Sequence, residues 1–347
     1  MDMMPVTDPL TRIRPPVRID DRVTVRHRLD DGSATDVVGW LVDLDPDRVR
    51  IQPPDPEGAS TPVSVRRERI ILARRVPPAL GGRPPARFTA EEVERIALPG
   101  WVDSTQRLGN WTLRLGNGFT GRANSCLAVG DPGSGEEELS YERAAAAIVD
   151  TYAAAGLEPR VQVIAGSETE WRLRALGWRQ TYVQTTVMTQ TLNGLLDGHP
   201  RDAQVRIDTE LTDTWWQGYL QYRPIPDHET ARRILINNPP VGLASISPDS
   251  ISPDSISPES IGGLVALGRG QLNQDWLGIA GLWTDPDHRR RGLATMIIRQ
   301  LAHWAARRGA RNAYLQVASE NSGALAAYRA LGFVEHHDYR YLAPTPE

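Results

Sequence analysis

Three consecutive arginines stand between a strand-like and a helix-like segment near the C-terminal end of the chain. The apolar run 276–283 precedes them, and apolar residues recur at helical spacing over residues 293–304. A helix N-terminus already favours negative charge, and the cluster Arg289–Arg291 adds further positive charge there. The cluster therefore predicts a bound anion that does not come from the chain itself. Gly292 and Ala294 are small and let successive backbone N–H groups approach a ligand. The pattern predicts a cradle for a diphosphate; the alternative is a solvated basic start of an amphipathic helix.

A second group of polar residues follows this cluster. Residues 312–317 have the pattern of a further strand, Asn321 comes directly after it, and a helical segment then carries Tyr328 before the sequence Leu-Gly-Phe at 331–333. Arg289-x-x-Gly-x-Ala resembles the coenzyme A signature of the GNAT acetyltransferases, written Q/R-x-x-G-x-G/A. The segment from Asn321 to Phe333 is similar to the family pattern N-x-x-A-x-x-x-Y-x-x-x-G-F, and all parts occur in family order.

This resemblance implies transfer of an acetyl group from acetyl-CoA to an amine, by direct attack of the neutral amine on the thioester. It implies that a backbone N–H at the end of the strand receives the developing oxyanion, that Tyr328 protonates the leaving thiolate and that Asn321 binds the pantetheine arm. Tyr328 as a packing residue and Asn321 as a helix N-cap are the alternatives. The residues expected to bind the cosubstrate are Leu282, Trp283, Thr284, Arg289, Arg290, Arg291, Gly292, Leu293, Ala294, Thr295 and Asn321.

The sequence does not identify the base that must deprotonate the amine. Glu320 and Asp285 are candidates because they lie next to the motifs, but a structural role is the favoured interpretation of each. His336 and His337 are also near, and as neighbours on a strand they are expected to face opposite sides of a sheet. No spacing fits a zinc site, so no metal is expected.

Composition predicts a soluble, globular protein of two or three units. The chain has 347 residues, 40% hydrophobic and 24% charged, with a formal net charge of −4, and this balance argues against a nucleic acid partner. It contains no lysine and one cysteine, Cys126, which excludes an internal disulfide and is expected in the core. We expect no membrane partner and a cytoplasmic location, because no apolar run reaches membrane-spanning length and the N-terminus does not resemble a signal peptide.

The N-terminal region is expected to be a separate small unit. Residues 1–17 are polar and proline-rich and predict a disordered tail, whereas residues 18–78 contain about five short strand-like runs. Such runs favour a small β-barrel of SH3 type, which some GNAT proteins carry. The barrel either recruits a partner or serves as a scaffold, and residues 79–87 form a Pro/Gly linker.

An internal repeat divides the rest of the chain. Arg-Ala-Leu-Gly-Trp at 174–178 recurs as Arg-Ala-Leu-Gly-Phe at 329–333, which indicates two tandem GNAT-like halves, 88–195 and 203–345. The first half carries three glutamates where the second has its arginines, so we expect it to be degenerate and to have lost coenzyme A. Its residues 118–125 are a candidate to face the acceptor across the seam between the halves, the alternative being a structural turn.

Two features of the second half complete the sequence interpretation. Three copies of Ser-Ile-Ser-Pro-Asp/Glu predict an expanded hairpin loop at 245–261, because repeated Ser-Pro sustains neither a helix nor a strand ladder. The aromatic residues Trp215, Trp216, Tyr219 and Tyr222 predict a helix packed mostly into the core.

The overall expectation is an α+β protein with an SH3-like barrel and two mixed α/β GNAT-like units, the second holding acetyl-CoA. The leading function is an N-acetyltransferase acting on a small-molecule or protein amine. The alternative is a non-catalytic acyl-CoA sensor that recruits a partner through the barrel.

Overall fold

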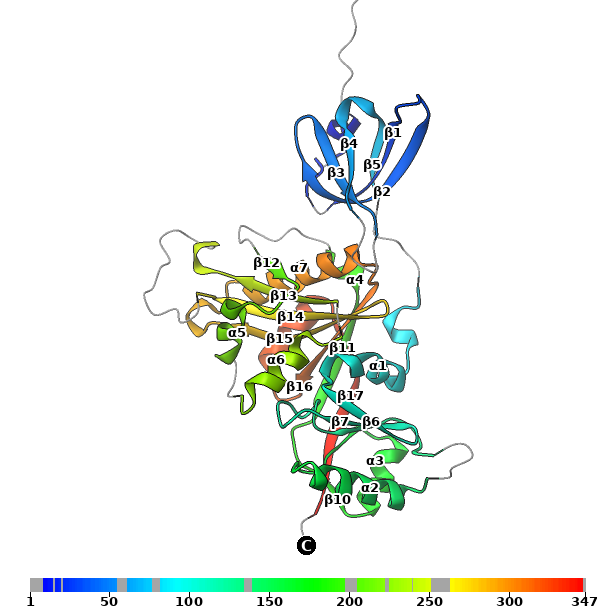
Figure 1. Ribbon diagram of the computed structural model, residues 1–347, viewed down its shortest axis with the longest axis vertical. Coiled ribbons are helices and arrows are strands. Elements are labelled where there is room, and N and C mark those ends of the chain that lie inside the picture. The colour runs from blue at the N-terminus through cyan, green and yellow to red at the C-terminus, as the bar shows by residue number, and fades with distance from the viewer. Residues whose placement is uncertain are drawn as a thin grey trace, which may run out of the picture. The chain divides into compact units, whose positions relative to one another are not determined.

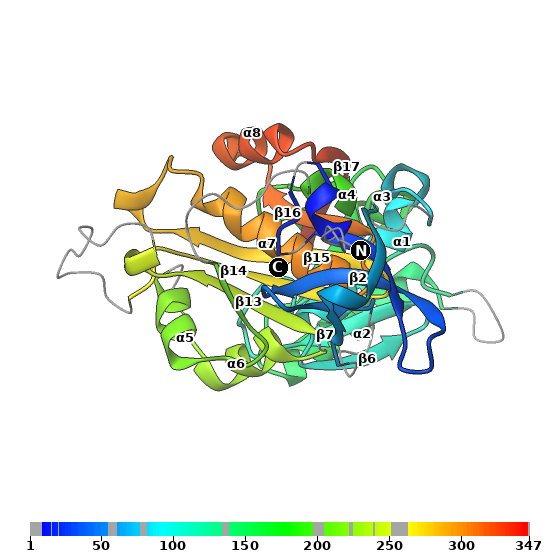
Figure 2. The ribbon, with the colours of Figure 1, turned by 90° about the horizontal axis from the view of Figure 1, so that it is seen from above.

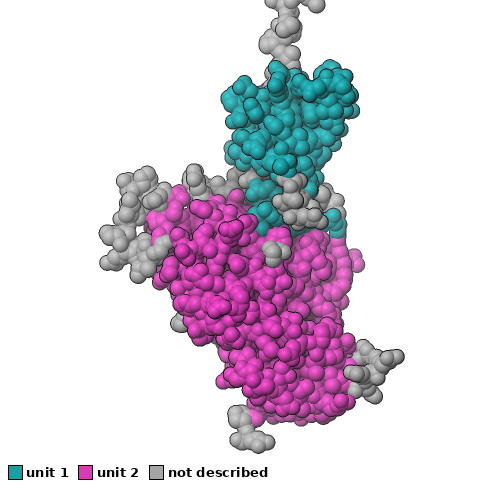
Figure 3. All heavy atoms as spheres, in the orientation of Figure 1, with its two compact units in different colours: residues 1–82, 303–311 teal, residues 83–302, 312–347 magenta. Residues whose placement is uncertain are grey.

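The computed structural model describes most of the chain. The described ranges are 9–14, 16–19, 21–54, 61–76, 82–133, 139–196, 205–221, 225–238, 240–250 and 263–345. Most of the expected tail and the Ser-Pro repeats beyond the first copy lie outside these ranges, as do Tyr222, the three glutamates 136–138 and residues 77–81 of the linker region. The chain forms two compact units, one of residues 1–82 with 303–311 and one of residues 83–302 with 312–347 (Figure 3).

The first unit contains an antiparallel five-stranded sheet in the order β4-β3-β2-β1-β5. Its strands are β1 (Arg22–Arg28), β2 (Ala34–Leu44), β3 (Arg48–Gln52), β4 (Val63–Arg66) and β5 (Ile70–Arg75). The expected five strands are therefore present, but β4 and β5 form the two edges and the described ladders do not close a barrel. Within the expected tail, Pro9–Arg12 forms a 3₁₀ turn and Leu10 is buried in the core of this sheet.

The second unit is built on one mixed sheet, which has twelve strands in the part of the chain that the structure describes (Figure 1). The first half contributes α1 (Ala90–Ala97), β6 (Ser104–Leu108), β7 (Trp111–Leu115), β8 (Cys126–Ala128), α2 (Tyr141–Ala154), β9 (Val161–Ile164), α3 (Glu168–Ala175), β10 (Trp178–Gln180), β11 (Thr185–Thr191) and α4 (Leu192–Leu196). The second half contributes β12 (Arg206–Asp208), α5 (Asp213–Leu220), α6 (His228–Ile236), β13 (Val241–Ile246), β14 (Ala266–Asn273), β15 (Trp276–Thr284), α7 (Leu293–Arg307), β16 (Asn312–Ala318), α8 (Ser322–Ala330) and β17 (Val334–Pro344).

Local sequence signals set the ends of the helices. Thr89 and Glu92 form a capping box at the start of α1, and Ser140 and Ser167 cap α2 and α3 through their side chains. The repeated Leu-Gly pair ends α3 and α8 in the same way, because Gly177 and Gly332 both adopt positive φ, at 88° and 85°. The internal repeat is therefore a repeat of structure as well as of sequence.

The two halves exchange their last strands. The strand order is β12-β13-β14-β15-β16-β11-β17-β9-β8-β7-β6, with β10 paired to β17. Strand β11 of the first half lies between β16 and β17 of the second half. The end of β17 in turn pairs with β9 over residues 339–342 and with β10 over residues 342–344. Each half thus completes the sheet of the other.

Helices cover the two faces of the sheet in the second half. Figure 2 shows α7 and α8 on one side and α5 and α6 on the other. The side chains of Ile297 and Leu301 of α7 approach the glycines Gly268 and Gly270 of β14 so closely that a Cβ at either glycine would clash. On the opposite face Gly218 of α5 makes a similarly close approach to β14. Small residues therefore let both helix layers approach the strand before β15.

Candidate active site

A pocket of about 850 Å³ lies where β15 passes into α7. Its lining contains nine of the eleven residues expected to bind the cosubstrate: Leu282, Trp283, Thr284, Arg289, Arg290, Gly292, Leu293, Ala294 and Thr295. Arg291 and Asn321 are not among the lining residues. Asp285 and Pro286 also line the pocket, and so do three residues that the motif does not include, Gln221, Leu264 and Ala327.

The end of β15 separates from its neighbour and opens this region. The parallel ladder between β15 and β16 ends at the pair Ile279–Leu315, although β15 continues to Thr284 and β16 to Ala318. A register shift against β14 occurs at the same level, and Gly281 adopts a φ of +60° there. Residues 280–284 are consequently only half-buried, and the last three of them face the pocket.

The connection from β15 to α7 has the backbone shape of an anion site. Asp285 accepts hydrogen bonds from the Asp287 N–H at 2.9 Å and contacts the His288 Nδ1 at 2.9 Å, which fixes a 3₁₀ turn. Arg290 and Gly292 then adopt positive φ, at 64° and 81°. Such alternation makes neighbouring N–H groups converge, and the first N–H groups of α7 lack partners within the helix.

The charge of this connection is positive. Arg289 donates from its Nε to the Thr284 carbonyl at 3.3 Å, which holds the side chain along the strand end. In the described part of the chain no carboxylate forms an ion pair with Arg289, Arg290 or Arg291. The guanidinium groups of Arg289 and Arg290, convergent N–H groups and a helix N-terminus together suit a phosphate-bearing ligand.

Tyr328 lies on α8 and Asn321 precedes that helix, and neither residue is in the lining of the pocket. The Asn321 side chain accepts a hydrogen bond from the Ala324 N–H at 3.1 Å, so it caps α8, which was the alternative weighed from the sequence. The half-buried Tyr328 ring packs edge-on against Phe333 with centroids 6.2 Å apart. The adjacent residue Ala327 does line the pocket.

The candidate bases have structural surroundings. Asp285 accepts the two hydrogen bonds of the 3₁₀ turn, and Glu320 is exposed. The expectation that His336 and His337 face opposite sides is wrong: their Nδ1 atoms lie 2.8 Å apart. A register shift between β11 and β17 falls at this position, and such a bulge turns adjacent side chains toward one side.

This histidine pair links β17 to the first half. His337 Nε2 lies 3.0 Å from the Oε1 of Glu94 on α1, and both side chains are buried. His336 Nε2 lies 3.0 Å from the Phe88 carbonyl, and burial lowers the pKa of His336. The pair therefore joins a strand of the second half to the first helix of the first half.

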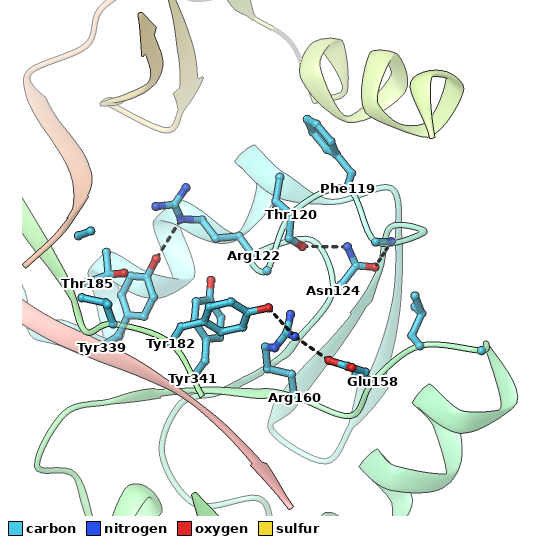
Figure 4. Close-up of a pocket in the computed structure, with 16 residues that line it drawn as sticks. Phe119, Thr120, Arg122, Asn124, Glu158, Arg160, Tyr182, Thr185, Tyr339 and Tyr341 are labelled. Atoms are coloured by element: carbon cyan, nitrogen blue, oxygen red, sulfur yellow. Dashed lines mark hydrogen bonds and ion pairs between the residues drawn. The ribbon is translucent and has the colours of Figure 1, made fainter. Parts of the chain in front are cut away.

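A second pocket, of about 690 Å³, lies at the seam between the halves (Figure 4). The predicted stretch 118–125 contributes Gly118, Phe119, Thr120, Gly121, Arg122 and Asn124 to its lining. Asn124 shapes this stretch, because its Oδ1 accepts the N–H groups of Gly116 and Gly118 at 2.9 and 3.0 Å. The opposite wall comes from Tyr182, Tyr339 and Tyr341, which the sequence did not indicate.

The expected core residues are buried. Cys126 is completely buried, and burial raises the pKa of its thiol to about 12. Trp215, Trp216 and Tyr219 are also buried. The described residues contain no group of three or more metal-ligating side chains, and none of their helices combines the length and apolar character needed to cross a membrane.

Comparison with known proteins gives a consistent relationship. Residues 89–342 match the family model described as "Probable histone acetyltransferase Rv0428c C-terminal". The uncharacterized N-acetyltransferase YobR of Bacillus subtilis is 26% identical over 258 residues, which cover 72% of this chain and 97% of YobR. A solved GCN5-related N-acetyltransferase from Kribbella flavida has a TM-score of 0.53 at 15% identity, covering 78% of this chain and 98% of its own. A protein of unknown function from Staphylococcus epidermidis has a TM-score of 0.50 at 11% identity, covering 75% and 99%. The two structural similarities show the fold.

Proposed function

Because the chain belongs to this acetyltransferase family and is a GNAT N-acetyltransferase, we propose that it uses acetyl-CoA, bound between β15 and α7, to acetylate an amine. One observation supports the cosubstrate site above all others: the expected signature residues line one pocket whose backbone and side chains suit phosphates. The alternative of a non-catalytic sensor is not favoured by the family relationship.

The residues of the pocket have distinct proposed roles. Arg289 and Arg290, with the first N–H groups of α7, would hold the diphosphate. Backbone N–H groups of residues 282–284 would hold the pantetheine arm and the oxyanion that forms as the amine attacks the thioester. The C–N bond then forms, the C–S bond breaks, and the amine proton leaves to a base or to water.

Tyr328 is the proposed proton donor to the leaving thiolate. Its ring packs against Phe333, and its own helix, α8, also supplies Ala327 to the pocket. Asn321 would then contribute through its capping of α8, in addition to the pantetheine contact that the resemblance implies.

Binding of acetyl-CoA tests the proposed site directly. Arg289→Ala should remove a charge-assisted contact of about 1.5–3 kcal/mol and weaken acetyl-CoA binding, as measured by calorimetry. Arg143→Ala is a matched control, because Arg143 is exposed in the first turn of α2, the corresponding helix of the first half. Unchanged affinity in Arg289→Ala would remove the diphosphate assignment.

We further propose that the N-terminal sheet is a small SH3-like module. The support is its strand order, with β1 between β2 and β5 and a 3₁₀ turn at Arg67–Arg69 joining β4 to β5. A chain that starts at Arg83 separates two roles. Loss of activity on protein acceptors with unchanged activity on small amines would favour recruitment, and unchanged activity on both would favour a scaffold.

A further inference from the structure

We propose that the seam pocket binds the acceptor and selects amines that carry an anionic group next to an aromatic or apolar body. This inference rests on the acetyl-transfer function proposed above and names the substrate class for it. The seam pocket is the 690 Å³ pocket formed by the stretch 118–124, the connection 156–160 and residues of β11, β16 and β17.

The position of the seam pocket suits an acceptor. Ala318, the last residue of β16, lines it, whereas Thr284, the last residue of β15, lines the cosubstrate pocket. These strands are parallel neighbours whose ladder has already ended at Ile279–Leu315. The two pockets therefore lie at the same end of adjacent strands, at the point where the strands have separated.

The charges of the seam pocket favour an anion. Its charged lining residues are Arg122, Arg160 and Glu158, two positive and one negative. The Glu158 side chain is 88% exposed, whereas the Arg160 side chain, which it contacts at 3.3 Å, is 12% exposed. Because an exposed carboxylate is well screened and a buried guanidinium is not, the interior of the pocket is positive.

Arg160 also has an unsatisfied donor. Its terminal nitrogen donates to Glu158 and to the Tyr182 hydroxyl at 3.0 Å, and its guanidinium lies 4.5 Å from the Tyr182 ring centroid. Its Nε, however, is buried and has no hydrogen-bond partner in the part of the chain that the structure describes. A buried donor without an acceptor is unfavourable, so an acceptor that reached this Nε would be bound favourably.

Arg122 is held in place from the opposite wall (Figure 4). Its Nε donates to the Tyr339 hydroxyl at 3.0 Å, and its guanidinium lies 5.4 Å from the ring centroid of Trp101. Both of these partners are uncharged, and they hold the side chain at the wall of the pocket. A guanidinium positioned in this way binds carboxylate and phosphate groups with little further loss of side-chain entropy.

The remaining walls are aromatic. The Tyr341 ring lies 5.9 Å from Tyr182 and 5.5 Å from Tyr339 between centroids, with both pairs edge-on, and Phe119 also lines the pocket. Burial raises the pKa of Tyr341 well above its ordinary value, so this phenol stays neutral. Neutral rings accommodate an apolar body, whereas the two arginines disfavour an acceptor with several positive charges.

Matched pairs of ligands test the inference by calorimetry on the full-length protein. Phenylalanine and phenylalaninamide differ in a carboxylate, and glucosamine 6-phosphate and glucosamine differ in a phosphate. We expect the anionic member of at least one pair to bind at least about tenfold more tightly, since a charge-assisted contact is worth that much. The pair with the larger ratio identifies the anion. Equal affinity within both pairs, or tighter binding of a lysine-rich peptide, would overturn the inference.

Variants test which residue causes the preference for the anionic ligand. Arg122→Met should abolish it while leaving acetyl-CoA affinity unchanged, whereas Tyr339→Phe, which keeps the guanidinium, should retain it. Arg107→Met is a control, because Arg107 is exposed on β6 and does not line the pocket. A preference that survives Arg122→Met would contradict the assignment.

Thiol release from acetyl-CoA separates this inference from the proposed function. A protein that prefers the anionic ligands in binding but releases no thiol with any amine would contradict acetyl transfer and support the pocket assignment. A protein that releases thiol with neutral and anionic amines alike, and binds them equally, would contradict the pocket assignment alone.

Discussion

The two halves make the same strand-to-helix connection, and the described residues of the two connections differ in what surrounds them. In the first half, between β8 and α2, the Gly130 carbonyl accepts hydrogen bonds from Trp111 Nε1 at 3.0 Å and Thr169 Oγ1 at 2.9 Å. The Pro132 carbonyl accepts one from the Asn110 N–H at 2.9 Å. The described part of this connection is therefore bound by side chains and backbone of its own half.

In the second half the corresponding connection faces a pocket. Asp285 of this connection is used within the turn, and the three arginines have no ion-pair partner among the described residues. Both connections have a glycine at positive φ, Gly130 at 75° and Gly292 at 81°, so this glycine alone does not distinguish them. From this comparison we propose that a duplicated fold keeps or loses a ligand according to whether the polar groups of this connection are satisfied within the protein.

Helices α3 and α8 also differ between the two halves. When the Arg-Ala-Leu-Gly segments of α3 and α8 are aligned, Leu173 occupies the place of Tyr328. Leu173 is completely buried in the core of the first half, whereas Tyr328 is half-buried beside the cosubstrate pocket. At this position the first half therefore lacks the proposed proton donor.

The largest expected effect comes from this tyrosine. Tyr328→Phe should lower kcat roughly 10²- to 10⁴-fold, the usual contribution of a general acid, with little change in acetyl-CoA affinity. Tyr141→Phe is the matched control, because Tyr141 begins α2 in the first half and should leave turnover unchanged. Steady-state thiol release measures both, and an unchanged rate in Tyr328→Phe would remove its proposed role.

The sequence predicted local structure better than long-range pairing. The strand, turn and helix around Arg289–Arg291 follow from periodicity and small residues over a short stretch, and the structure has them at 276–284 and 293–307. Strands β6 and β11 were not indicated: β6 is exposed along almost its whole length, and β11 is rich in threonine and buried from Thr185 to Thr189, so neither alternates in the expected way.

The candidate site was predictable where one motif encodes it and not where distant segments meet. The motif gave most of the lining of the cosubstrate pocket, but Gln221 and Leu264 come from elements remote in sequence. The walls of the seam pocket from Tyr339 and Tyr341 depend on the strand exchange, which no local pattern reveals. The contact between His336 and His337 likewise depends on strand register, because a bulge brings the two side chains together.

The strand exchange is itself held by a partly buried ion pair. Arg340 of β17 donates to both carboxylate oxygens of Glu170 on α3 at 2.8 Å, and the Glu170 side chain is only 5% exposed. Arg340→Ala should lower the free energy of unfolding by about 1.5–3 kcal/mol, since it removes hydrogen bonds to a buried charge. Arg172→Ala, which breaks an exposed pair with Glu168, should cost at most about 0.5 kcal/mol. Urea denaturation distinguishes them, and equal losses would contradict a special role for the exchange.

The same carboxylate gives the exchange a pH dependence. Burial acts to raise the pKa of Glu170, but hydrogen bonds from the Gly166 N–H, Arg340 and Arg174 outweigh it and leave the pKa below its ordinary value of 4.5. A carboxyl group whose pKa is lower in the folded state stabilises the fold at pH values above its unfolded-state pKa. This stabilisation is lost as the pH falls through the folded-state pKa. The free energy of unfolding should therefore begin to fall below about pH 4.5. In Arg340→Ala it should depend less on pH in this range. An unaltered acid profile in the variant would contradict this linkage.

The smallest effect gives the sharpest comparison of the two connections. Gly130→Ala and Gly292→Ala both place a side chain at positive φ, which should cost each variant about 1–2 kcal/mol of stability. Only Gly292→Ala should also weaken acetyl-CoA binding, because only there does the strained backbone present its N–H groups to a ligand. Calorimetric titration of both variants with acetyl-CoA, each at the same interval below its melting temperature, measures this difference in affinity. If both variants lose affinity equally, the effect is a general loss of stability and the first half is not the closed counterpart of the second; if Gly130→Ala alone loses affinity, the assignment of the two halves is reversed.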